Sequence, residues 1–337
     1  MSAITFDRVS IVFGDDPERA LPPMDAGKTR AEVRAETNQV LGVHDCSLTV
    51  EDGEIVVLMG LSGSGKSTLL RAVNGLNPVV RGEVRVATQG GEVAVGRASR
   101  KQLRDLRLRT VSMVFQQFGL LPWRTVRDNV GLGLELGGQS ATQRRKRVDE
   151  ELELVGLADR ADALVGELSG GMQQRVGLAR AFTTDAPILL MDEPFSALDP
   201  LIRSRLQDEL LELQAERGKT ILFVSHDLDE AFKLGNRIAI MEGGRIIQTG
   251  TPRDIFTAPA DAYVADFVAH MNPLGVLTAR DVMTDGDAGT EAVEAETPVQ
   301  DIIDRLTAGM ILRVTDGGRQ IGQITPTSVL ERLSRGG

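Results

Sequence analysis

The sequence predicts an α/β fold, in which a mainly parallel sheet is covered by helices. Two patterns alternate along the chain: short, continuous apolar runs, and longer segments with apolar residues at helical spacing, such as Leu206, Leu210 and Leu213. Continuous apolar runs are typical of parallel strands buried on both faces, and their alternation with helices indicates an α/β core. The runs are Ile55–Met59, Ile188–Met191, Thr220–Val224 and Arg237–Met241.

The N-terminal part is expected to add further strands. Ile4–Phe6, Ser10–Phe13 and Gly42–Val50 are rich in strand-forming residues, and Glu83–Gly96 is typical of a hairpin turning at a Gly-Gly pair. The polar, proline-containing stretch Gly14–Asn38 predicts an insertion that leaves the sheet and returns to it.

Gly60–Thr68, GLSGSGKST, fits the phosphate-loop pattern G-x-x-x-x-G-K-[ST]. The loop follows a predicted strand and opens a predicted helix with Leu69, Leu70, Val73 and Leu76 on one face. Backbone N–H groups and the helix dipole favour phosphate there, Lys66 would reach the β- and γ-phosphates, and Ser67 would ligate Mg²⁺. The loop residues expected to bind are Gly60, Leu61, Ser62, Gly63, Ser64, Gly65, Lys66, Ser67 and Thr68.

Asp192 and Glu193 end the second buried strand. We expect Asp192 to hold Mg²⁺ through water and Glu193 to act as general base on the attacking water. The alternative is a pair of acids at a strand end without chemistry. Pro194 and the SALD segment that follows favour the catalytic interpretation.

A second candidate anion site lies at LSGGM, where Ser169 suits a helix N-cap and Gly170 and Gly171 allow close backbone approach. One chain needs only one such site. The pattern therefore predicts that this segment closes over the γ-phosphate held by a second copy. The alternative is an ordinary helix cap.

Composition limits the function classes. The 337 residues allow two domains, and the formal net charge of −10 disfavours nucleic acid as a partner. Cys46 is the one cysteine, which fits a reducing compartment. The start MSAITFDRVS has charges where a signal peptide needs an apolar run, and no run approaches the length that spans a bilayer. A membrane role would therefore require a partner.

A helical subdomain is expected from about residue 116 to 175, where no strand pattern occurs. Its basic run Arg144–Arg147 could meet lipid phosphates, but a solvated helix face is the commoner explanation. A boundary is expected near Asn272-Pro273. Beyond it, Ile311, Val314, Ile321 and Ile324 alternate as in a small sheet accompanied by two helices.

Taken together, these motifs resemble the nucleotide-binding subunit of ABC (ATP-binding cassette) transporters, over roughly residues 4 to 272. The resemblance implies the ABC ATPase fold, ATP and Mg²⁺ as ligands, and further roles. Gln116 resembles the Q-loop glutamine at Mg²⁺ and water, with Gln117 as the neighbouring register. Asp199 resembles the D-loop aspartate at a dimer interface, His226 the switch histidine that senses the γ-phosphate, and Phe13 the aromatic that stacks on adenine.

The insertion and the segments LLPWRTVRDNV, FSALDPLIR and SHDLDEA resemble ATPases of glycine betaine, proline betaine and choline importers. The ending MNPLGVLTARDVM looks most like that of the bacterial choline importer ATPase. Residues 273–337 resemble a single CBS-like α+β module. The module could regulate the ATPase by sensing adenine nucleotides or ionic strength. The alternatives are a simple clamp between two tails or a remnant, and these are favoured.

The resemblance implies a homodimer, two integral-membrane permease subunits, indirectly an external substrate-binding protein, and a peripheral location on the cytoplasmic face of the inner membrane. Phe118–Trp123 is a candidate permease-docking patch, unless Trp123 packs inside the helical subdomain. Other candidate functions are a soluble ABC ATPase of DNA repair or translation, a nucleotide-sensing regulator and an exporter. The single cassette, intact ATPase motifs and betaine-type insertion favour import.

Overall fold

A computed structural model describes residues 1–269, 273–289 and 291–334. Contacts between Cα atoms divide the chain into two compact units, one of Met1–His226 with Ala239–Ile247, the other of Asp227–Ile238 with Gln248–Gly337. The boundary expected near Asn272-Pro273 falls on residue 272, outside the described residues. Within the described ranges, no helix combines the length and apolar content needed to cross a bilayer.

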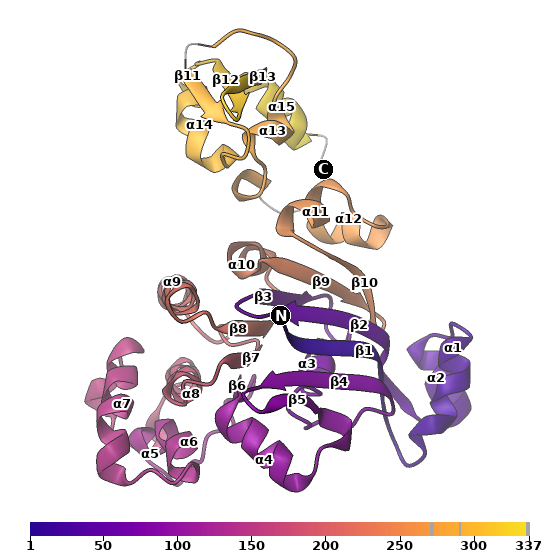
Figure 1. Ribbon diagram of the computed structural model, residues 1–337, viewed down its shortest axis with the longest axis vertical. Coiled ribbons are helices and arrows are strands. Elements are labelled where there is room, and N and C mark those ends of the chain that lie inside the picture. Colours follow the sequence, from indigo (N-terminus) through magenta and orange to yellow (C-terminus); the bar gives the residue numbers. More distant parts are fainter. Residues whose placement is uncertain (270–272, 290, 335–337) are drawn as a thin grey trace. The chain divides into compact units, whose positions relative to one another are not determined.

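The α/β prediction is confirmed by a six-stranded sheet in the order β10-β9-β3-β8-β7-β6 (Figure 1). Strands β3, β8, β7 and β6 run parallel. Residues of β3, β7 and β8 are all buried, as their apolar runs predicted. The strands are β3 (Ile55–Met59), β6 (Val111–Val114), β7 (Ile188–Asp192), β8 (Thr220–Val224), β9 (Arg237–Glu242) and β10 (Arg245–Gly250).

A second sheet of the described residues has the order β2-β1-β4-β5 and is antiparallel. The prediction of two separate strands at Ile4–Phe6 and Ser10–Phe13 was wrong, because β1 continues through both. Arg8 has φ 48° at a register shift, so the strand bends without ending. The strands are β1 (Ser2–Phe13), β2 (Val40–Glu51), β4 (Arg81–Thr88) and β5 (Gly91–Ala94), the last two forming the expected hairpin.

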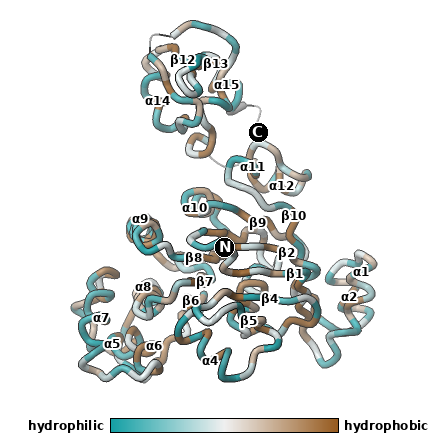
Figure 2. The backbone as a smooth tube through the Cα atoms, viewed as in Figure 1, coloured by the Kyte–Doolittle hydropathy of each residue, from teal (hydrophilic) through white to brown (hydrophobic). Residues whose placement is uncertain are grey.

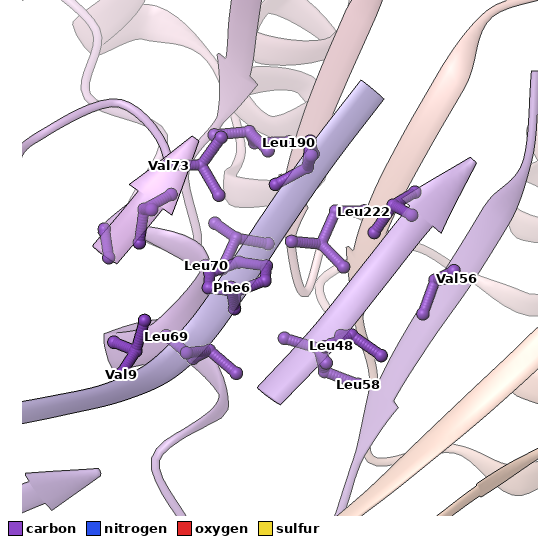
Figure 3. Packing of buried hydrophobic residues seen from close by; sticks show 14 of the residues in the cluster. Phe6, Val9, Leu48, Val56, Leu58, Leu69, Leu70, Val73, Leu190 and Leu222 are labelled. Atoms are coloured by element: carbon purple, nitrogen blue, oxygen red, sulfur yellow. The ribbon is translucent and has the colours of Figure 1, made fainter. Parts of the chain in front are cut away.

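The hydrophobic core of this first unit lies between its sheets. Phe6, Leu48, Leu58 and Leu222 lie together in it (Figure 3). Apolar side chains of this kind stabilise the fold by about 1.5–3 kcal/mol each when fully buried. Hydrophobic colour accordingly follows β3 and β8, whereas the outer helix α2 (Arg30–Thr37) is largely hydrophilic (Figure 2).

The helix after the phosphate loop is shorter than predicted. Helix α3 spans only Lys66–Leu70. After Leu70, the N–H groups of Ala72 and Val73 donate to carbonyls three residues back rather than four. Gly75 then has φ 68°, a backbone conformation that does not continue a right-handed helix. Leu69, Leu70 and Val73 are buried as expected, but Leu76 is 47% exposed.

The remaining helices of the first unit include those of the insertion and those of the expected helical subdomain. Helices α5, α6, α7 and α8 gather beside the β6–β7 edge of the sheet (Figure 1). Besides α3, the α-helices described in the first unit are α1 (Leu21–Asp25), α2, α4 (Arg100–Arg109), α5 (Val126–Val130), α6 (Leu132–Leu136), α7 (Ala141–Leu154), α8 (Gly170–Thr183) and α9 (Pro200–Arg217).

The second unit contains a three-stranded sheet in the order β11-β12-β13, within its described residues. The alternation predicted for it was wrong at Ile311, which is 37% exposed, because Leu312 begins the strand and takes the buried position. Its elements are α10 (Leu228–Leu234), α11 (Pro252–Thr257), α12 (Ala262–Val268), α13 (Ala279–Val282), β11 (Glu291–Glu294), α14 (Val299–Thr307), β12 (Leu312–Asp316), β13 (Arg319–Ile324) and α15 (Pro326–Ser334).

Candidate functional site

The candidate site lies at the carboxyl ends of the four parallel strands. The phosphate loop follows β3, Gln116 follows β6, Asp192 ends β7, and His226 follows β8. Carboxyl ends of neighbouring parallel strands meet at one edge of the sheet, which is where α/β proteins bind ligands. Residues distant in the sequence are therefore brought to one place.

The phosphate loop is built around glycines that no other residue could replace. A Cβ added to Gly60 would lie 2.1 Å from the Met241 carbonyl oxygen, and Gly60 has φ 138°. Gly65 is the N-cap of α3, with φ 107°. The loop therefore packs tightly against the sheet and presents the start of α3, where N–H groups lack helical partners.

Lys66 lies across this loop. Its Nζ donates to the carbonyl oxygens of Gly60, at 2.7 Å, and Leu61, at 3.1 Å. Burial lowers the pKa of the Lys66 ammonium, while the charges of Glu193 and Asp192 act in the opposite direction. Ser64 Oγ is buried without a hydrogen-bond partner among the described atoms. A buried cation and an unpaired hydroxyl at a glycine loop fit a phosphate ligand.

Asp192 is fully buried beneath the loop. Its Oδ1 accepts a 2.6 Å hydrogen bond from Ser67 Oγ, and its Oδ2 accepts from Arg71 Nη2 at 2.9 Å. A hydroxyl beside a carboxylate is a hard oxygen donor set, which fits Mg²⁺. The sequence analysis missed Arg71. Its position at i+4 from Ser67, one turn along the same helical face, was the available signal.

The Glu193 carboxylate contacts two of the four residues whose roles the resemblance implied, Gln116 and His226. Its Oε2 accepts from Gln116 Nε2 at 3.1 Å and lies 3.3 Å from His226 Nδ1. Gln117 has no such contact among the described residues, which favours the Gln116 register. Glu193 also has φ 48°, a conformation rarely adopted outside glycine and often found at functional sites.

Gln174 is a second residue that sequence reasoning missed. It is buried, its Nε2 donates to the Glu193 carbonyl at 2.9 Å, and its Oε1 accepts from Ala197 N at 2.9 Å. This amide links α8, which begins at the LSGG segment, to the loop after β7. These hydrogen bonds hold the first turns of α8 against the Glu193 backbone.

Ser169 and Asp199 each cap a helix. Ser169 Oγ accepts from Met172 N at 3.4 Å at the start of α8, and Asp199 Oδ1 accepts from Ile202 N at 3.1 Å at the start of α9. Neither has a hydrogen bond to the phosphate loop among the described residues. Gly170 and Gly171, like Ser169, thus lie outside the cluster around Lys66.

Phe13 ends β1 and is 39% exposed. It lies beside Gly42, because a Cβ at Gly42 would come within 3.0 Å of Phe13 Cε2 and of Thr68 Cγ2. An exposed aromatic ring therefore lies next to the last residue of the phosphate loop.

The alternative that Trp123 packs inside the helical region was wrong, since its side chain is 72% exposed. The preceding turn is fixed by Arg180, which donates to the carbonyls of Phe118, at 2.8 Å, and Gly119, at 2.7 Å. The basic run Arg144–Arg147 lies on α7, and each of its side chains pairs with a carboxylate. That pairing favours a solvated helix face.

Comparisons with known proteins agree with this geometry. A family profile described as "ABC transporter" matches residues 43–196. The glycine betaine/proline betaine transport system ATP-binding protein ProV of Salmonella typhimurium is 48% identical over 271 residues, covering 80% of this chain and 67% of ProV. The trimethylamine N-oxide transport system ATP-binding protein TmoW of Ruegeria pomeroyi is 45% identical, covering 96% of this chain and 94% of TmoW.

A solved structure is similar as well. The dimeric, post-hydrolysis state of the ATP-binding cassette MJ0796 bound to ADP and Pi gives a TM-score of 0.64 at 30% identity, covering 74% of this chain and 98% of that one. The predicted ABC ATPase fold is therefore confirmed. By its motifs, its fold and its full-length relative, the chain belongs to the ABC transporter family, as the ATP-binding ATPase subunit of a transport system.

Proposed function

We propose that the chain hydrolyses MgATP to energise uptake of a small methylated amine by an importer. The observation that carries the ATPase part is the convergence of Gln116 and His226 on Glu193, next to the Ser67–Asp192 pair. These groups provide a general base, its orienting partners and a cation site beside a phosphate loop. Such positioning and charge stabilisation account for most catalysis of phosphoryl transfer.

Ser67 and Gln116 would hold Mg²⁺, and Asp192 would hold it through water. When bound, the ion neutralises charge on the phosphates. Lys66 exchanges its carbonyl partners for phosphate oxygens. Glu193 accepts the proton of the attacking water, while His226 orients Glu193 and senses the γ-phosphate. Phe13 stacks on adenine, for which its exposed ring beside Thr68 is suitably placed.

Two copies form the complete site. Ser169, Gly170 and Gly171 of one copy would close over the γ-phosphate held by the other, with Asp199 at the interface. The hydrogen bonds of Ser169 and Asp199 support this idea. Each side chain caps the N-terminus of its own helix, and neither is hydrogen-bonded to the phosphate loop of its own chain within the described residues, so both helix N-termini can face a second copy. The dimeric state of the similar cassette MJ0796 supports it independently.

We further propose that the dimer binds two permease subunits at the cytoplasmic face of the inner membrane, with Phe118–Trp123 in the contact, and acts indirectly with an external substrate-binding protein. The exposed Trp123 supports this, since exposed aromatic residues are enriched at partner sites. Residues 1–272 would form the ABC domain, with a helical subdomain at about 116–175, and residues 273–337 a CBS-like module that clamps the two tails together.

The proposed solutes share a methylated nitrogen. The names of the relatives mention glycine betaine, proline betaine and trimethylamine N-oxide, and the full-length relative TmoW supports the last. Choline, implied by the resemblance of the chain's ending, belongs to the same chemical class and remains a candidate.

The test is uptake of labelled trimethylamine N-oxide, glycine betaine and choline by cells that carry the wild-type chain, the Glu193→Gln variant or no chain. We expect uptake of one of these amines to be lost in the variant and the deletion alike. Unchanged uptake of all three would contradict the proposed solute class, while ATPase activity of the purified chain would show whether the enzymatic assignment survives.

A further inference from the structure

The insertion between β1 and β2 reaches the nucleotide site. Helix α2 begins at Arg30, after the N-cap Thr29, which forms a capping box with Glu32. The Arg30 guanidinium donates through Nη1 to the Gly63 carbonyl of the phosphate loop and through Nη2 to the Gly42 carbonyl of β2. One side chain therefore links the insertion, the sheet and the loop.

Arg30 lies directly against the phosphate loop. A Cβ added to Gly65 would come within 3.3 Å of Arg30 Nη2. The residue is half-buried, burial lowers the pKa of its guanidinium, and its Nε is buried without a partner among the described atoms. A cation so placed is held by the surrounding structure and is not a mobile surface group.

Two successive loop carbonyls accept hydrogen bonds from residues outside the loop. Arg30 binds the Gly63 oxygen, and Gly244 N donates to the Ser64 oxygen at 3.0 Å. A carbonyl that turned inward would present its negative end to a phosphate. Gly63 has φ 79°, and glycine allows its neighbouring peptide unit to rotate with little steric cost. Donors that keep these two carbonyls occupied would therefore favour a loop conformation that receives an anion.

The insertion is fixed well enough to present Arg30. At the end of α1, Asp25 accepts from Arg81 Nη1 at 2.7 Å and lies 2.9 Å from His44 Nε2. Arg245 Nη2 donates to the Met24 carbonyl at 3.1 Å. These contacts connect α1 to β2, β4 and β10, so the short loop between α1 and α2 has an anchored start.

We propose that Arg30 is a positioning residue for nucleotide binding, which holds the crest of the phosphate loop in its anion-accepting conformation and makes ATP affinity depend on the insertion. This inference rests on the proposed ATPase function. It assigns Arg30 no contact with the reacting atoms. Loss of the side chain should therefore weaken ATP binding while leaving the chemical step unchanged.

The test compares full-length wild type with Arg30→Ala, Arg30→Lys and Arg34→Ala, by MgATP titration and by steady-state ATPase kinetics. Arg34 is the matched control, because it is an exposed arginine on the same helix. We expect Arg30→Ala to raise both Kd and KM for MgATP about tenfold, equivalent to about 1.4 kcal/mol, with kcat within about twofold. Lysine can replace one of the two donor contacts and should restore part of the affinity.

Lys66→Ala provides the reference for a lost phosphate site. The inference is wrong if Arg30→Ala binds MgATP as wild type does while Lys66→Ala loses binding, or if Arg34→Ala weakens binding equally. A fall in kcat at unchanged KM would also overturn it. Failure of the wild-type chain to bind MgATP would overturn the proposed function itself and, with it, this inference.

Discussion

At the residue scale, the site depends on Glu193, whose carboxylate contacts Gln116 from one strand end and His226 from another. Its unusual φ of 48° is held by a backbone bond from Glu193 N to the Val224 oxygen at 3.1 Å. Backbone strain of this kind costs about 1–3 kcal/mol and persists only where the surrounding structure fixes it. The sheet therefore determines where the proposed base lies.

Replacement of Glu193 by Gln keeps the shape and the contact with Gln116 but removes the proton acceptor. We expect ATP affinity close to that of wild type and turnover lower by about 10²–10⁴-fold, the usual contribution of a general base. Single-turnover hydrolysis measures this directly. Near-normal turnover would remove Glu193 from the proposed role.

Arg71 should matter for stability as well as for the site. It balances the fully buried carboxylate of Asp192, to which it donates from Nε at 3.2 Å and Nη2 at 2.9 Å. Removing one partner of a buried polar pair costs about 1–3 kcal/mol. Urea unfolding of Arg71→Ala should show a loss of this size, and Arg97→Ala, an exposed arginine elsewhere, should show little change. Equal stabilities would contradict the pairing argument.

Cys46 gives a prediction in pH. Burial raises the pKa of its thiol from 9.0 to about 11. Below pH 9 the thiol is neutral in both states, and between about pH 9 and 11 only the unfolded thiol ionises, so this group's contribution to stability falls across that window. At pH 9 a thiolate-specific reagent should label the folded chain slowly and the urea-unfolded chain fast. Equal rates would show that the thiol is accessible.

Residue placement was predictable where one local motif contains the chemistry. Four site residues could be identified because each ends or follows a recognisable buried strand, namely Lys66, Ser67, Asp192 and Glu193. For Arg71, whose partner lies 121 residues away, the sequence offered only the i+4 spacing from Ser67. Gln174 could not be identified, since its partner Glu193 lies 19 residues away and only packing brings them together. Arg30 escaped notice for the same reason.

At the element scale, continuous apolar runs predicted the parallel strands because strands buried on both faces need no alternation. The predictions of where β1 and α3 end failed, because the backbone conformation of single residues affects such ends. Arg8 bends β1 without ending it, and Gly75 follows the end of α3 with φ 68°, although the apolar spacing continues to Leu76. Hydrophobic spacing alone contains no information on either event.

Trp123 lies exposed in the turn before helix α5. A change there can therefore separate effects on the folding of the subunit from effects on its coupling to the permease. Because 72% of this side chain is exposed, Trp123→Ala should leave the thermal midpoint and the ATP affinity of the purified subunit almost unchanged. We expect amine uptake by the assembled importer to fall severalfold. A matched change at Leu136, which is 54% exposed at the end of α6, should not reduce uptake. Unfolding of the Trp123 variant would indicate a packing role instead.

At the scale of the whole molecule, the ABC fold followed from the order of motifs, while the domain boundary near residue 272 stays a prediction. The second compact unit includes Asp227–Ile238 as well as the C-terminal residues. Such a division depends on contacts between distant segments, and a linear search for linkers detects only boundaries that interrupt the sequence once. The second copy, by contrast, was predicted from the sequence through the LSGG segment, and Ser169 has no hydrogen bond to the phosphate loop of its own chain among the described residues.

If ATP is held between two copies, the Glu193→Gln variant should associate when ATP is added. Sedimentation velocity should show a monomer without nucleotide and a dimer with MgATP. Adding Ser169→Arg, which would place a large side chain where the partner's γ-phosphate is proposed to lie, should return the chain to a monomer while each copy still binds ATP. A Glu193→Gln chain that stays monomeric in saturating MgATP, or dimerises regardless of Ser169, would contradict the account.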